Sequence, residues 1–452
     1  MSQLEENLEA VRPSRAETIE ESAERQFTRW IILASGEGAG KVASLYFTKM
    51  KNEAIDNRIL LMNSNRTDIS NTLLELEKKA VTEEEKALIA QIGRRNILLF
   101  GGGGAGNVYK EGEEYARKDF ETKIRRPIEA LGTAAGDVVL DMAALGGGTG
   151  NGSIPYIIHQ MKHGTSVSLQ NHIHVALAIL PYSTEPDQRQ FNAVCGLSRL
   201  LKFGDNSQQN ADMVLIVDNS KIAENIELTE GIDPKFPDIN KKIIKAIDLM
   251  IAPGRLSKGV IDIKDYVKFP SLMNLYHFTP CVSVDNDINF IEIEMALDEA
   301  AKNSFVNMDP KTAVIGYLIV SVPEKHLNKG DFTEDKINSI FNKWKKENIC
   351  GKMGMVSLAY NKSKKDTFDV LLLLGGFSLK EMLEKPWQDF KSLKKILMMA
   401  EEGGHVELDN VKLSVEEIVR IEGILKNYID HTEKVVKEFC KEEEDEDEVE
   451  EE

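Results

Sequence analysis

The chain has 452 residues, 42% of them hydrophobic, and a formal net charge of −18. This length allows two or three domains with large cores, and the acidic balance disfavours direct binding of nucleic acid. The longest apolar runs, such as residues 370–374, are far too short to cross a membrane, and the charged N-terminal stretch lacks the apolar core of a secretory signal, so we expect a soluble cytoplasmic protein.

A charged leader, residues 1–28, precedes a series of short apolar runs separated by helical patterns. The runs lie at residues 30–34, 59–62, 97–100, 138–142, 175–180 and 213–217. Strands that are apolar throughout and alternate with helices indicate a parallel sheet covered on both faces. Ligands of such sheets bind at the carboxyl ends of the strands. We therefore predict an α/β fold that begins with a Rossmann-like domain over residues 29–232.

Loop-forming residues follow four of these runs, and we expect them to surround the phosphates of a nucleotide. In chain order they are Gly36, Glu37, Gly38, Gly40 and Lys41; Asn63 and Asn65; Gly103, Gly104, Ala105, Gly106 and Asn107; and Gly146, Gly147, Gly148, Thr149, Gly150 and Asn151. The last group lies in GGGTGNGS, between an apolar run and an amphipathic segment. Glycines let backbone N–H groups converge on phosphate oxygens, and the following helix adds the positive end of its dipole. The alternative is a glycine-rich turn without a ligand.

Two common nucleotide motifs are excluded by the spacing. A P-loop requires an opening glycine and a Ser or Thr after its lysine, whereas this chain has Ser35 and Val42 at those positions. A dinucleotide-binding loop lacks its third glycine here, and no acid ends the second run. A nicotinamide-dependent oxidoreductase is therefore poorly supported. Lys41 lies near a phosphate or base, or is an exposed lysine in the first turn of a helix.

The second half of the chain predicts a long central helix, a mixed sheet and a helical C-terminus. A helix over residues 238–250 falls within a connecting segment, 233–270. Residues 271–378 form a second α/β domain, in which runs 353–360 and 367–375 read as a hairpin. Residues 379–441 are helical, and 442–452, ten of them acidic, should be disordered. That last segment is either a solvated tail or a docking site for a basic protein partner.

GGGTGNGS resembles the GGGTGTG-type signature of the tubulin/FtsZ superfamily of self-assembling GTPases, and the two-domain pattern over residues 28–380 is similar to theirs. The resemblance implies GTP or GDP as ligand, Mg²⁺ as cofactor and head-to-tail polymerisation of the chain with itself. Glu185 and Arg189 match an FtsZ pair that holds ribose, although a structural ion pair is the alternative. By likeness to tubulin, Asn219 would read the guanine edge, Phe236 would stack on the base and Asn240 would hydrogen-bond it.

Residues 259–265 resemble the synergy loop that one subunit inserts into the nucleotide site of its neighbour. Asp262 and Asp265 match its acidic positions, which would orient the attacking water, unless they are acids favoured by a helix N-terminus. Val260 and Asn65 depart from the family pattern. The mixture of features resembles an archaeal or plasmid- or phage-borne tubulin-like protein. We expect an assembly-activated GTPase that forms GDP and phosphate, and the alternative is a nucleotide-binding structural polymer with little or no GTPase activity.

Overall fold

A computed structural model of the chain describes residues 29–50, 55, 57–132, 138–164, 170, 172–204, 209–252, 263–326, 330, 332–402 and 414–450. The chain divides into two compact units. Unit 1 comprises Met1–Ala211 and Lys385–Gly423, and unit 2 comprises Asp212–Glu384 and Ile424–Glu452. Each unit is described by itself below.

Unit 1 is built on a parallel sheet with the strand order β3-β2-β1-β4-β5. The strands are β1 (Trp30–Ser35), β2 (Ile59–Asn63), β3 (Ile97–Leu99), β4 (Val138–Ala144) and β5 (Ile173–Leu180). All six residues of β1 are buried, as expected for a strand with helices on both faces. The predicted Rossmann-like sheet is thereby confirmed, and each predicted strand in this unit is present within a few residues of its expected bounds.

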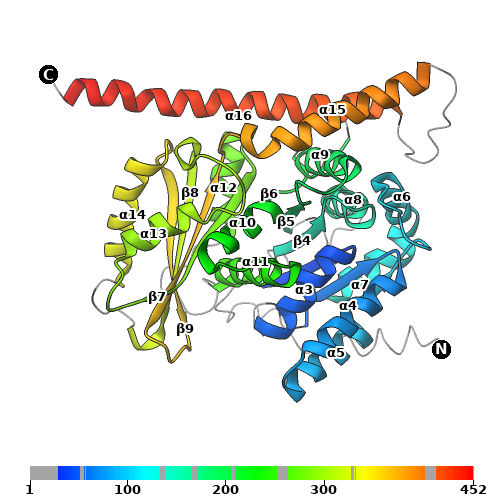
Figure 1. Ribbon diagram of the computed structural model, residues 1–452, viewed down its shortest axis with the longest axis horizontal. Helices are drawn as coiled ribbons and strands as arrows, with labels where there is room; N and C mark the ends of the chain where they lie inside the picture. Colours follow the sequence, from blue (N-terminus) through cyan, green and yellow to red (C-terminus); the bar gives the residue numbers. More distant parts are fainter. Residues whose placement is uncertain are drawn as a thin grey trace. The chain divides into compact units, whose positions relative to one another are not determined.

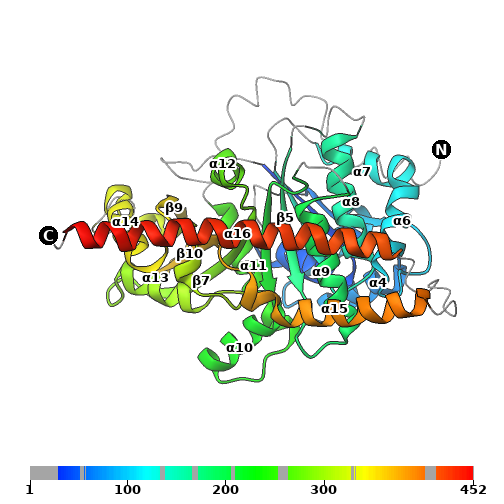
Figure 2. The same cartoon turned by 90° about the horizontal axis from the view of Figure 1, so that it is seen from above.

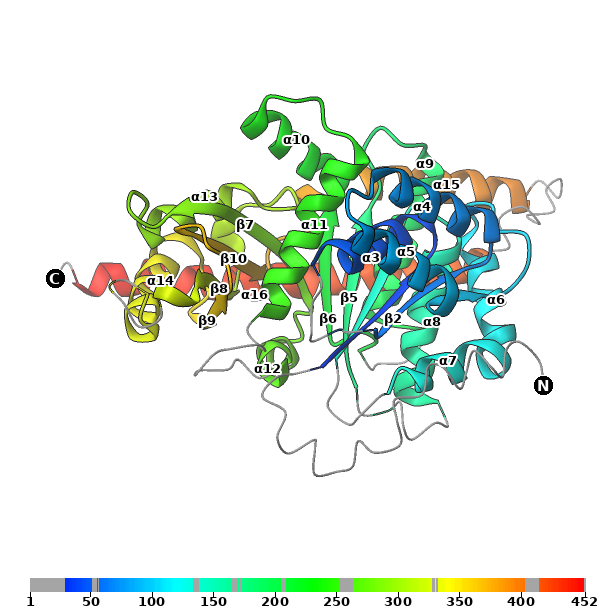
Figure 3. The same ribbon diagram turned by 90° about the horizontal axis from the view of Figure 1, so that it is seen from below.

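Helices of unit 1 pack in groups that cover its sheet. They are α3 (Glu37–Met50), α4 (Arg66–Lys79), α5 (Glu83–Arg95), α6 (Tyr109–Asp119), α7 (Arg125–Ala130), α8 (Thr149–His163) and α9 (Asp187–Leu201). Helix α3 packs against α4 and α5, and these three lie together in Figure 3. Helix α8 packs against α6 and α9 and also contacts β1 and β4. The sheet edge that carries the loops after β1 and β4 is thus bordered by the first turns of α3 and α8.

Two C-terminal helices, α15 (Lys380–Glu402) and α16 (Val415–Glu450), end the described chain. They run side by side over part of their length, where Lys394 pairs with Glu422 (Figure 2). The predicted helical C-terminus is confirmed. We predicted residues 442–452 as a disordered tail, whereas α16 continues through most of this segment to Glu450. Glutamate is a good helix former, so a helix that is already nucleated can extend through such a sequence.

Unit 2 contains a mixed sheet with the strand order β6-β7-β10-β8-β9. The strands are β6 (Met213–Asp218), β7 (His277–Asp287), β8 (Ile315–Pro323), β9 (Met353–Asn361) and β10 (Thr367–Gly375). Strand β10 runs antiparallel to both β7 and β8, and β9 runs parallel to β8. The predicted mixed sheet is confirmed, but the predicted hairpin is wrong, because β8 lies between β9 and β10. Strand β7 was not predicted at all.

The helices of unit 2 include the predicted central helix. They are α10 (Asn219–Glu230), α11 (Phe236–Ile251), α12 (Ile263–Met273), α13 (Ile293–Lys302) and α14 (Glu334–Asn348). Ile239, Ile243, Ile244 and Ile247 form the buried stripe of α11, as their spacing predicted. Helices α13 and α14 contact each other and lie on the same side of the sheet of this unit (Figure 1).

The division between the units differs from the predicted domain limits. We placed the first boundary at residue 232, but β6 and α10 belong to unit 2. The reason is pairing, since β6 is hydrogen-bonded to β7 in the register Val214↔His277. The C-terminal helices do not form a separate domain, because their residues are shared between the units. Among the described helices, none combines the length and the apolar character that a membrane span requires.

Candidate functional site

Four loops follow four neighbouring strands of unit 1. Strands β3, β2, β1 and β4 are consecutive and parallel, so their carboxyl ends lie at the same edge of the sheet. The first loop (residues 36–41) follows β1, the second (63–65) ends β2, the third (101–107) follows β3 and the fourth (146–151) follows β4. The strand order therefore brings together the four sets of loop residues that the sequence singled out.

The first and fourth loops approach each other too closely for side chains. Gly36 has a left-handed backbone, with φ of 83°, and a Cβ atom built on it would lie 3.0 Å from the backbone nitrogen of Gly150. A Cβ atom on Gly150 would lie 2.2 Å from the carbonyl oxygen of Ser35, a distance that real Cβ atoms do not adopt. The hydroxyl groups of Ser35, which precedes Gly36, and Ser153 of α8 are 2.7 Å apart. These glycines are therefore required by packing as well as by any ligand.

Helix α8 begins at the fourth loop without a side-chain cap. Gly148 is its N-cap residue and provides no side-chain hydrogen bond to the first turn. The Thr149 hydroxyl is 2.7 Å from that of Ser64 in the second loop. The N–H groups of the first turn of a helix have no partner within the helix, and the helix dipole makes this end positive. Such a helix start is suited to an anion, and a phosphate group is the usual one.

The third loop has an unusual run of left-handed residues. Its positive φ values are 66°, 87°, 90°, 52° and 61°, at Gly101, Gly103, Gly104, Gly106 and Asn107. The Gly101 N–H donates to Asp119 at 2.6 Å, and the Gly104 N–H donates to the carbonyl of Ser64 at 3.2 Å. A backbone that alternates in this way turns successive N–H groups toward a common concavity, which binds anions. The loop thus provides a second set of donors beside α8.

Side chains of the second loop are occupied in local hydrogen bonds. Asn65 caps α4 by accepting from the Thr67 N–H at 3.0 Å, and its amide donates to Asp68 at 2.9 Å. Asn63 accepts from the Asn65 N–H at 3.1 Å. Both predicted residues therefore hold the backbone of the loop and the start of α4. This bonding gives the departure at Asn65 from the family pattern a structural purpose.

Carboxylates beside these loops are suited to binding a divalent cation. Burial and the negative charge of Glu37 raise the pKa of Asp68, and the Asn63 hydrogen bond and Lys41 offset part of this effect. Lys41 pairs with Glu37 at 2.7 Å and therefore does not extend freely over the loops. In the ranges that the structure describes, no three His, Cys, Asp or Glu side chains form a complete metal site. Mg²⁺ bound to a nucleotide, however, takes most of its ligands from phosphate and water and needs only one or two carboxylates, such as that of Asp68.

Glu185 and Arg189 form an ion pair at the start of α9. The other oxygen of Glu185 accepts from the backbone N–H of Tyr182 at 2.9 Å. Arg189 lies beside the fourth loop, because a Cβ atom on Gly146 would be 3.3 Å from the Cβ atom of Arg189. The pair is thus next to the glycine loop, where its exposed atoms can meet a ligand.

The remaining predicted residues belong to unit 2. Asn219 begins α10 and is nearly buried, and burial raises the pKa of the preceding Asp218 to about 6 although the Ser220 N–H bonds its carboxylate. Phe236 begins α11 with 52% of its surface exposed, and Asn240 lies in the first turns of the same helix. Asp262 lies outside the described residues. Asp265 is in α12, and its side chain is not among those described.

Comparison with known proteins identifies the part of the chain that contains the four loops. The model of the GTPase domain of the tubulin/FtsZ family matches residues 17–227. This part of the chain belongs to the tubulin/FtsZ family. Similar curated proteins are the cell division protein FtsZ of Methanothermobacter thermautotrophicus, 32% identical over 203 residues, and FtsZ 1 of Thermococcus kodakarensis, 31% identical over 197 residues. These matches cover 44% and 42% of this chain and 45% and 48% of the relatives, so the chain matches about half the length of either.

Solved structures extend the likeness over both units at the level of the fold. CetZ1 from Haloferax volcanii, whose structure is that of a GDP-bound monomer, has a TM-score of 0.59 and 19% identity, covering 81% of this chain and 100% of CetZ1. CetZ from Methanosaeta thermophila has a TM-score of 0.60 and 18% identity, covering 88% and 99%. The chain thus has the α/β fold of these two structures, as its alternating apolar runs and helical patterns predicted.

Sequence reasoning missed several polar residues of this tubulin/FtsZ-family domain. Ser64 lies between two predicted residues, and its position in the second loop was the signal that could have identified it. Asn192 and Arg199 lie inside α9, far from any loop in the sequence, and contact the third and fourth loops or the start of α8. A polar residue in the middle of a helix has no local pattern that distinguishes it, so only the fold reveals these contacts.

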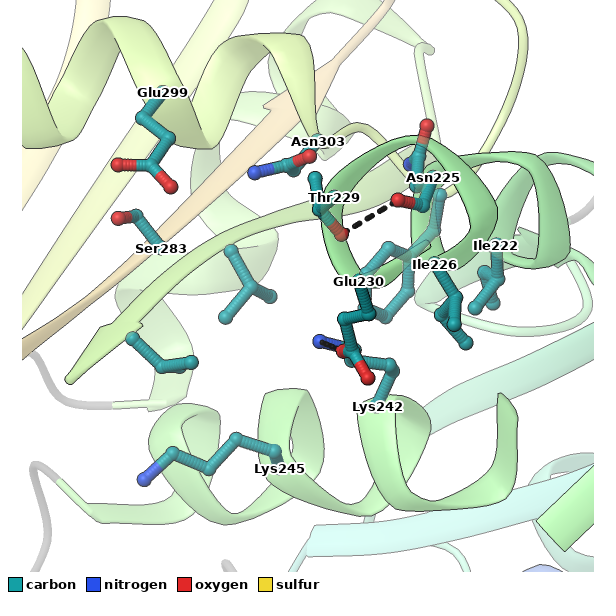
Figure 4. Close-up of a pocket in the computed structure, with 13 residues that line it drawn as sticks. Ile222, Asn225, Ile226, Thr229, Glu230, Lys242, Lys245, Ser283, Glu299 and Asn303 are labelled. Carbon is teal, nitrogen blue, oxygen red and sulfur yellow. Dashed lines mark hydrogen bonds and ion pairs between the residues drawn. The ribbon is translucent and has the colours of Figure 1, made fainter. Parts of the chain in front are cut away.

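Unit 2 contains a separate cavity of about 230 Å³, between α10, α11, β7 and α13 (Figure 4). Two of its charged residues, Lys242 and Glu230, pair with each other at 2.7 Å, and Lys245 pairs at 2.7 Å with Asp369, which does not line the cavity. The Thr229 hydroxyl donates to the carbonyl of Asn225 at 2.7 Å. This cavity is lined by residues of unit 2 alone and shares none with the four loops.

Proposed function

We propose that the chain is a cytoskeletal GTP-binding protein and that the four loops of unit 1 hold the phosphates of GTP or GDP. The observation that carries the proposal is the packing of Gly36 against Gly150 beside an uncapped helix start. Backbone N–H groups of the third and fourth loops would surround the phosphates, and the α8 dipole would favour their negative charge. The family match over residues 17–227 supports the same ligand class.

Recognition of ribose and base would use the predicted residues outside the loops. Glu185 and Arg189, paired and beside Gly146, are suited to the ribose hydroxyls. Asn219, Phe236 and Asn240 would read guanine by amide hydrogen bonds and by stacking on an aromatic face. Asp68 would supply a carboxylate to Mg²⁺ bound by the phosphates, and the ion would offset the charge of the γ-phosphate.

Hydrolysis would occur where two copies of the chain meet head to tail. Asp262 and Asp265 of one subunit would reach the nucleotide of the next and orient the attacking water. A head-to-tail interface does not close on itself, so repeated association gives a filament. The γ-phosphate would leave as inorganic phosphate and GDP would remain bound.

Nucleotide binding is tested first, by titrating a fluorescent GDP analogue into the purified chain and displacing it with GTP, GDP or ATP. We expect displacement by both guanine nucleotides and not by ATP. Binding of the analogue to wild type that is lost in a Gly147→Val variant with the melting temperature of wild type would tie the ligand to the fourth loop, because a Cβ atom on Gly147 meets no other atom closer than the Ala144 carbonyl oxygen at 3.8 Å. No binding to wild type, in the presence of Mg²⁺, would refute the proposal.

Assembly and hydrolysis are tested together, by light scattering and phosphate release across a range of protein concentrations with GTP and Mg²⁺. An assembly-activated GTPase shows a threshold concentration above which both signals rise. Asp265→Ala should abolish phosphate release and keep the filaments, while Asp335→Ala, an exposed acid in the first turn of α14, should change neither. Scattering without phosphate release in wild type would instead identify a structural polymer that does not hydrolyse its nucleotide.

A further inference from the structure

Asn192 joins the third and fourth glycine loops from outside the site. It lies in α9 and is fully buried, with no exposed surface. Its side-chain amide donates to the carbonyl of Asn107 at 2.7 Å and to the carbonyl of Gly146 at 3.1 Å. Asn107 is the last residue of the third loop and Gly146 the first of the fourth. One planar amide group therefore fixes the end of one loop to the start of the other.

One further hydrogen bond holds the side chain of Asn192, and another links its backbone to Asn151. The Gln188 side chain donates to the Asn192 side-chain oxygen at 3.2 Å. The backbone carbonyl of Asn192 accepts from the side chain of Asn151 at 2.6 Å, and the same Asn151 amide donates to the carbonyl of Leu145 at 2.5 Å. Asn151 is in the first turn of α8 and, like Asn192, has no exposed surface. The two asparagines thus connect α9, the fourth loop and the helix start that follows it.

This arrangement matters because glycine-rich loops need contacts from outside to hold one conformation. The third loop contains four left-handed glycines and the left-handed Asn107. Glycine loses more conformational freedom on ordering than any other residue, so an unrestrained loop would be ordered at the expense of ligand affinity. An N–H group binds a phosphate oxygen well only over a narrow range of distance and angle. Two loops that share one ligand must therefore be held in register with each other.

We propose that Asn192 is a positioning residue of the nucleotide site, which preorganises the third and fourth loops for the phosphate chain without touching the nucleotide. The inference rests on the proposed binding of GTP or GDP to these loops. Both N–H donors of the Asn192 amide are bonded to protein carbonyls. Asn192 would therefore change nucleotide affinity only by fixing the backbone of the two loops.

Asn210 offers a matched control in the same unit. It is buried to the same degree, and its amide also donates to two backbone carbonyls, those of Pro155 at 3.0 Å and Arg199 at 2.9 Å. Pro155 lies in α8 beyond its first turn, and Arg199 lies near the end of α9. Asn210 therefore bonds the same two helices but neither glycine loop. Loss of either amide should lower the stability of unit 1 by a similar amount.

The test compares Asn192→Leu with Asn210→Leu, and adds Asn192→Ser, a smaller change that keeps one donor, in case the leucine variant does not fold. Affinity for GDP and for guanosine is measured by displacement of the fluorescent GDP analogue, and the melting temperature is measured without nucleotide. We expect Asn192→Leu to weaken GDP binding about tenfold or more and Asn192→Ser by an intermediate factor, with guanosine binding changed less than twofold. Asn210→Leu should change neither affinity by more than about twofold at a similar loss of melting temperature.

Equal losses for GDP and guanosine would overturn the inference, because they would indicate general destabilisation and no specific effect on the phosphate loops. An Asn192→Ser variant that binds GDP as tightly as wild type would overturn it as well, and so would an Asn210→Leu variant that loses as much affinity. A wild-type chain that binds no guanine nucleotide would instead refute the proposed function, and the two failures are therefore distinguishable.

Discussion

The guanidinium group of Arg199 lies 2.6 Å from a carboxylate oxygen of Glu113, and only 6% and 4% of these side chains are exposed. Arg199 also donates to the carbonyls of Asn151 at 3.0 Å and Gly152 at 3.2 Å, in the first turn of α8. Burial alone would raise the pKa of Glu113, but Arg199, Lys110 and Arg117 lower it below its usual value. The helix start that faces the proposed phosphates is thus held from behind by a buried ion pair.

Removing one partner of this pair should be strongly destabilising. Glu113→Gln leaves the buried guanidinium without its countercharge, so we expect a loss of about 3–5 kcal/mol in the free energy of unfolding of unit 1. Arg117 also pairs with Glu113, at 2.6 Å, but its own side chain is 57% exposed, so Arg117→Ala should cost less than about 1 kcal/mol. Denaturant unfolding followed by tryptophan fluorescence measures both. Similar small losses in the two variants would contradict the importance of the buried pair.

Phe390 of α15 should be essential for α15 to stay packed on α9 within unit 1. Its ring is fully buried and stacks on Phe191 of α9, with centroids 5.1 Å apart and planes 12° apart. Phe390→Ala should lower the stability by about 3–5 kcal/mol, as for other large-to-small changes in a core. Ile396→Ala, in the same helix but 60% exposed, should change it by less than about 0.5 kcal/mol. Limited proteolysis within α15 is a second measurement, and resistance equal to wild type in Phe390→Ala would count against this docking.

The sequence predicted the strands of unit 1 because they are apolar throughout, and it missed β7 because that strand is not. His277, Thr279, Pro280 and Ser283 interrupt its apolar residues, and a proline normally argues against a strand inside a sheet. The wrong hairpin has another cause. Two strands separated by a short turn usually pair, but here β8 has both as neighbours, and no local signal encodes this long-range choice.

A similar limit applies to the candidate site. The glycine loops were predictable because backbone contact with phosphate needs residues without side chains at consecutive positions. Asn192 was not, because its partners, Asn107 and Gly146, are 85 and 46 residues away in the chain. Residues that support a site from a neighbouring helix are selected by geometry, and their types follow no local rule.

The pH dependence of unit 2 should reflect His277. Its ring is fully buried, with Nδ1 2.8 Å from the Tyr428 hydroxyl and Nε2 2.8 Å from the carbonyl of Phe377. Burial lowers the pKa of His277 from 6.5 to about 4, although the bond to the Phe377 carbonyl raises it slightly. The unfolded chain therefore binds a proton at pH values where the folded chain does not. The contribution of His277 to the free energy of unfolding is therefore fully present above about pH 6.5. It is lost as the pH falls toward 4, by up to about 3 kcal/mol.

Thermal melts between pH 4 and 8 measure this effect. His277→Asn should be less stable than wild type at pH 7, because Tyr428 and the Phe377 carbonyl lose their partner, but its stability should fall less steeply between pH 6.5 and 4. His326→Asn, which removes a half-buried imidazole paired with Asp366, should keep the steep fall. An unchanged slope in His277→Asn would assign the acid sensitivity to other groups.

Within the fourth loop, the two glycines Gly147 and Gly150 should differ in their tolerance of a methyl group. A Cβ atom on Gly150 would lie 2.2 Å from the Ser35 carbonyl oxygen, whereas one on Gly147 would lie 3.8 Å from the Ala144 carbonyl oxygen, which is ordinary van der Waals contact. Gly150→Ala must push β1 and α8 apart, and we expect it to lower the free energy of unfolding by about 2–3 kcal/mol. Gly147→Ala should stay within about 0.5 kcal/mol of wild type without nucleotide. Melting temperatures of the two variants, measured without and with GDP, separate the packing requirement from the ligand requirement. A Gly147→Ala variant as unstable as Gly150→Ala would mean that the loop backbone, rather than its contact with β1, sets the need for glycine.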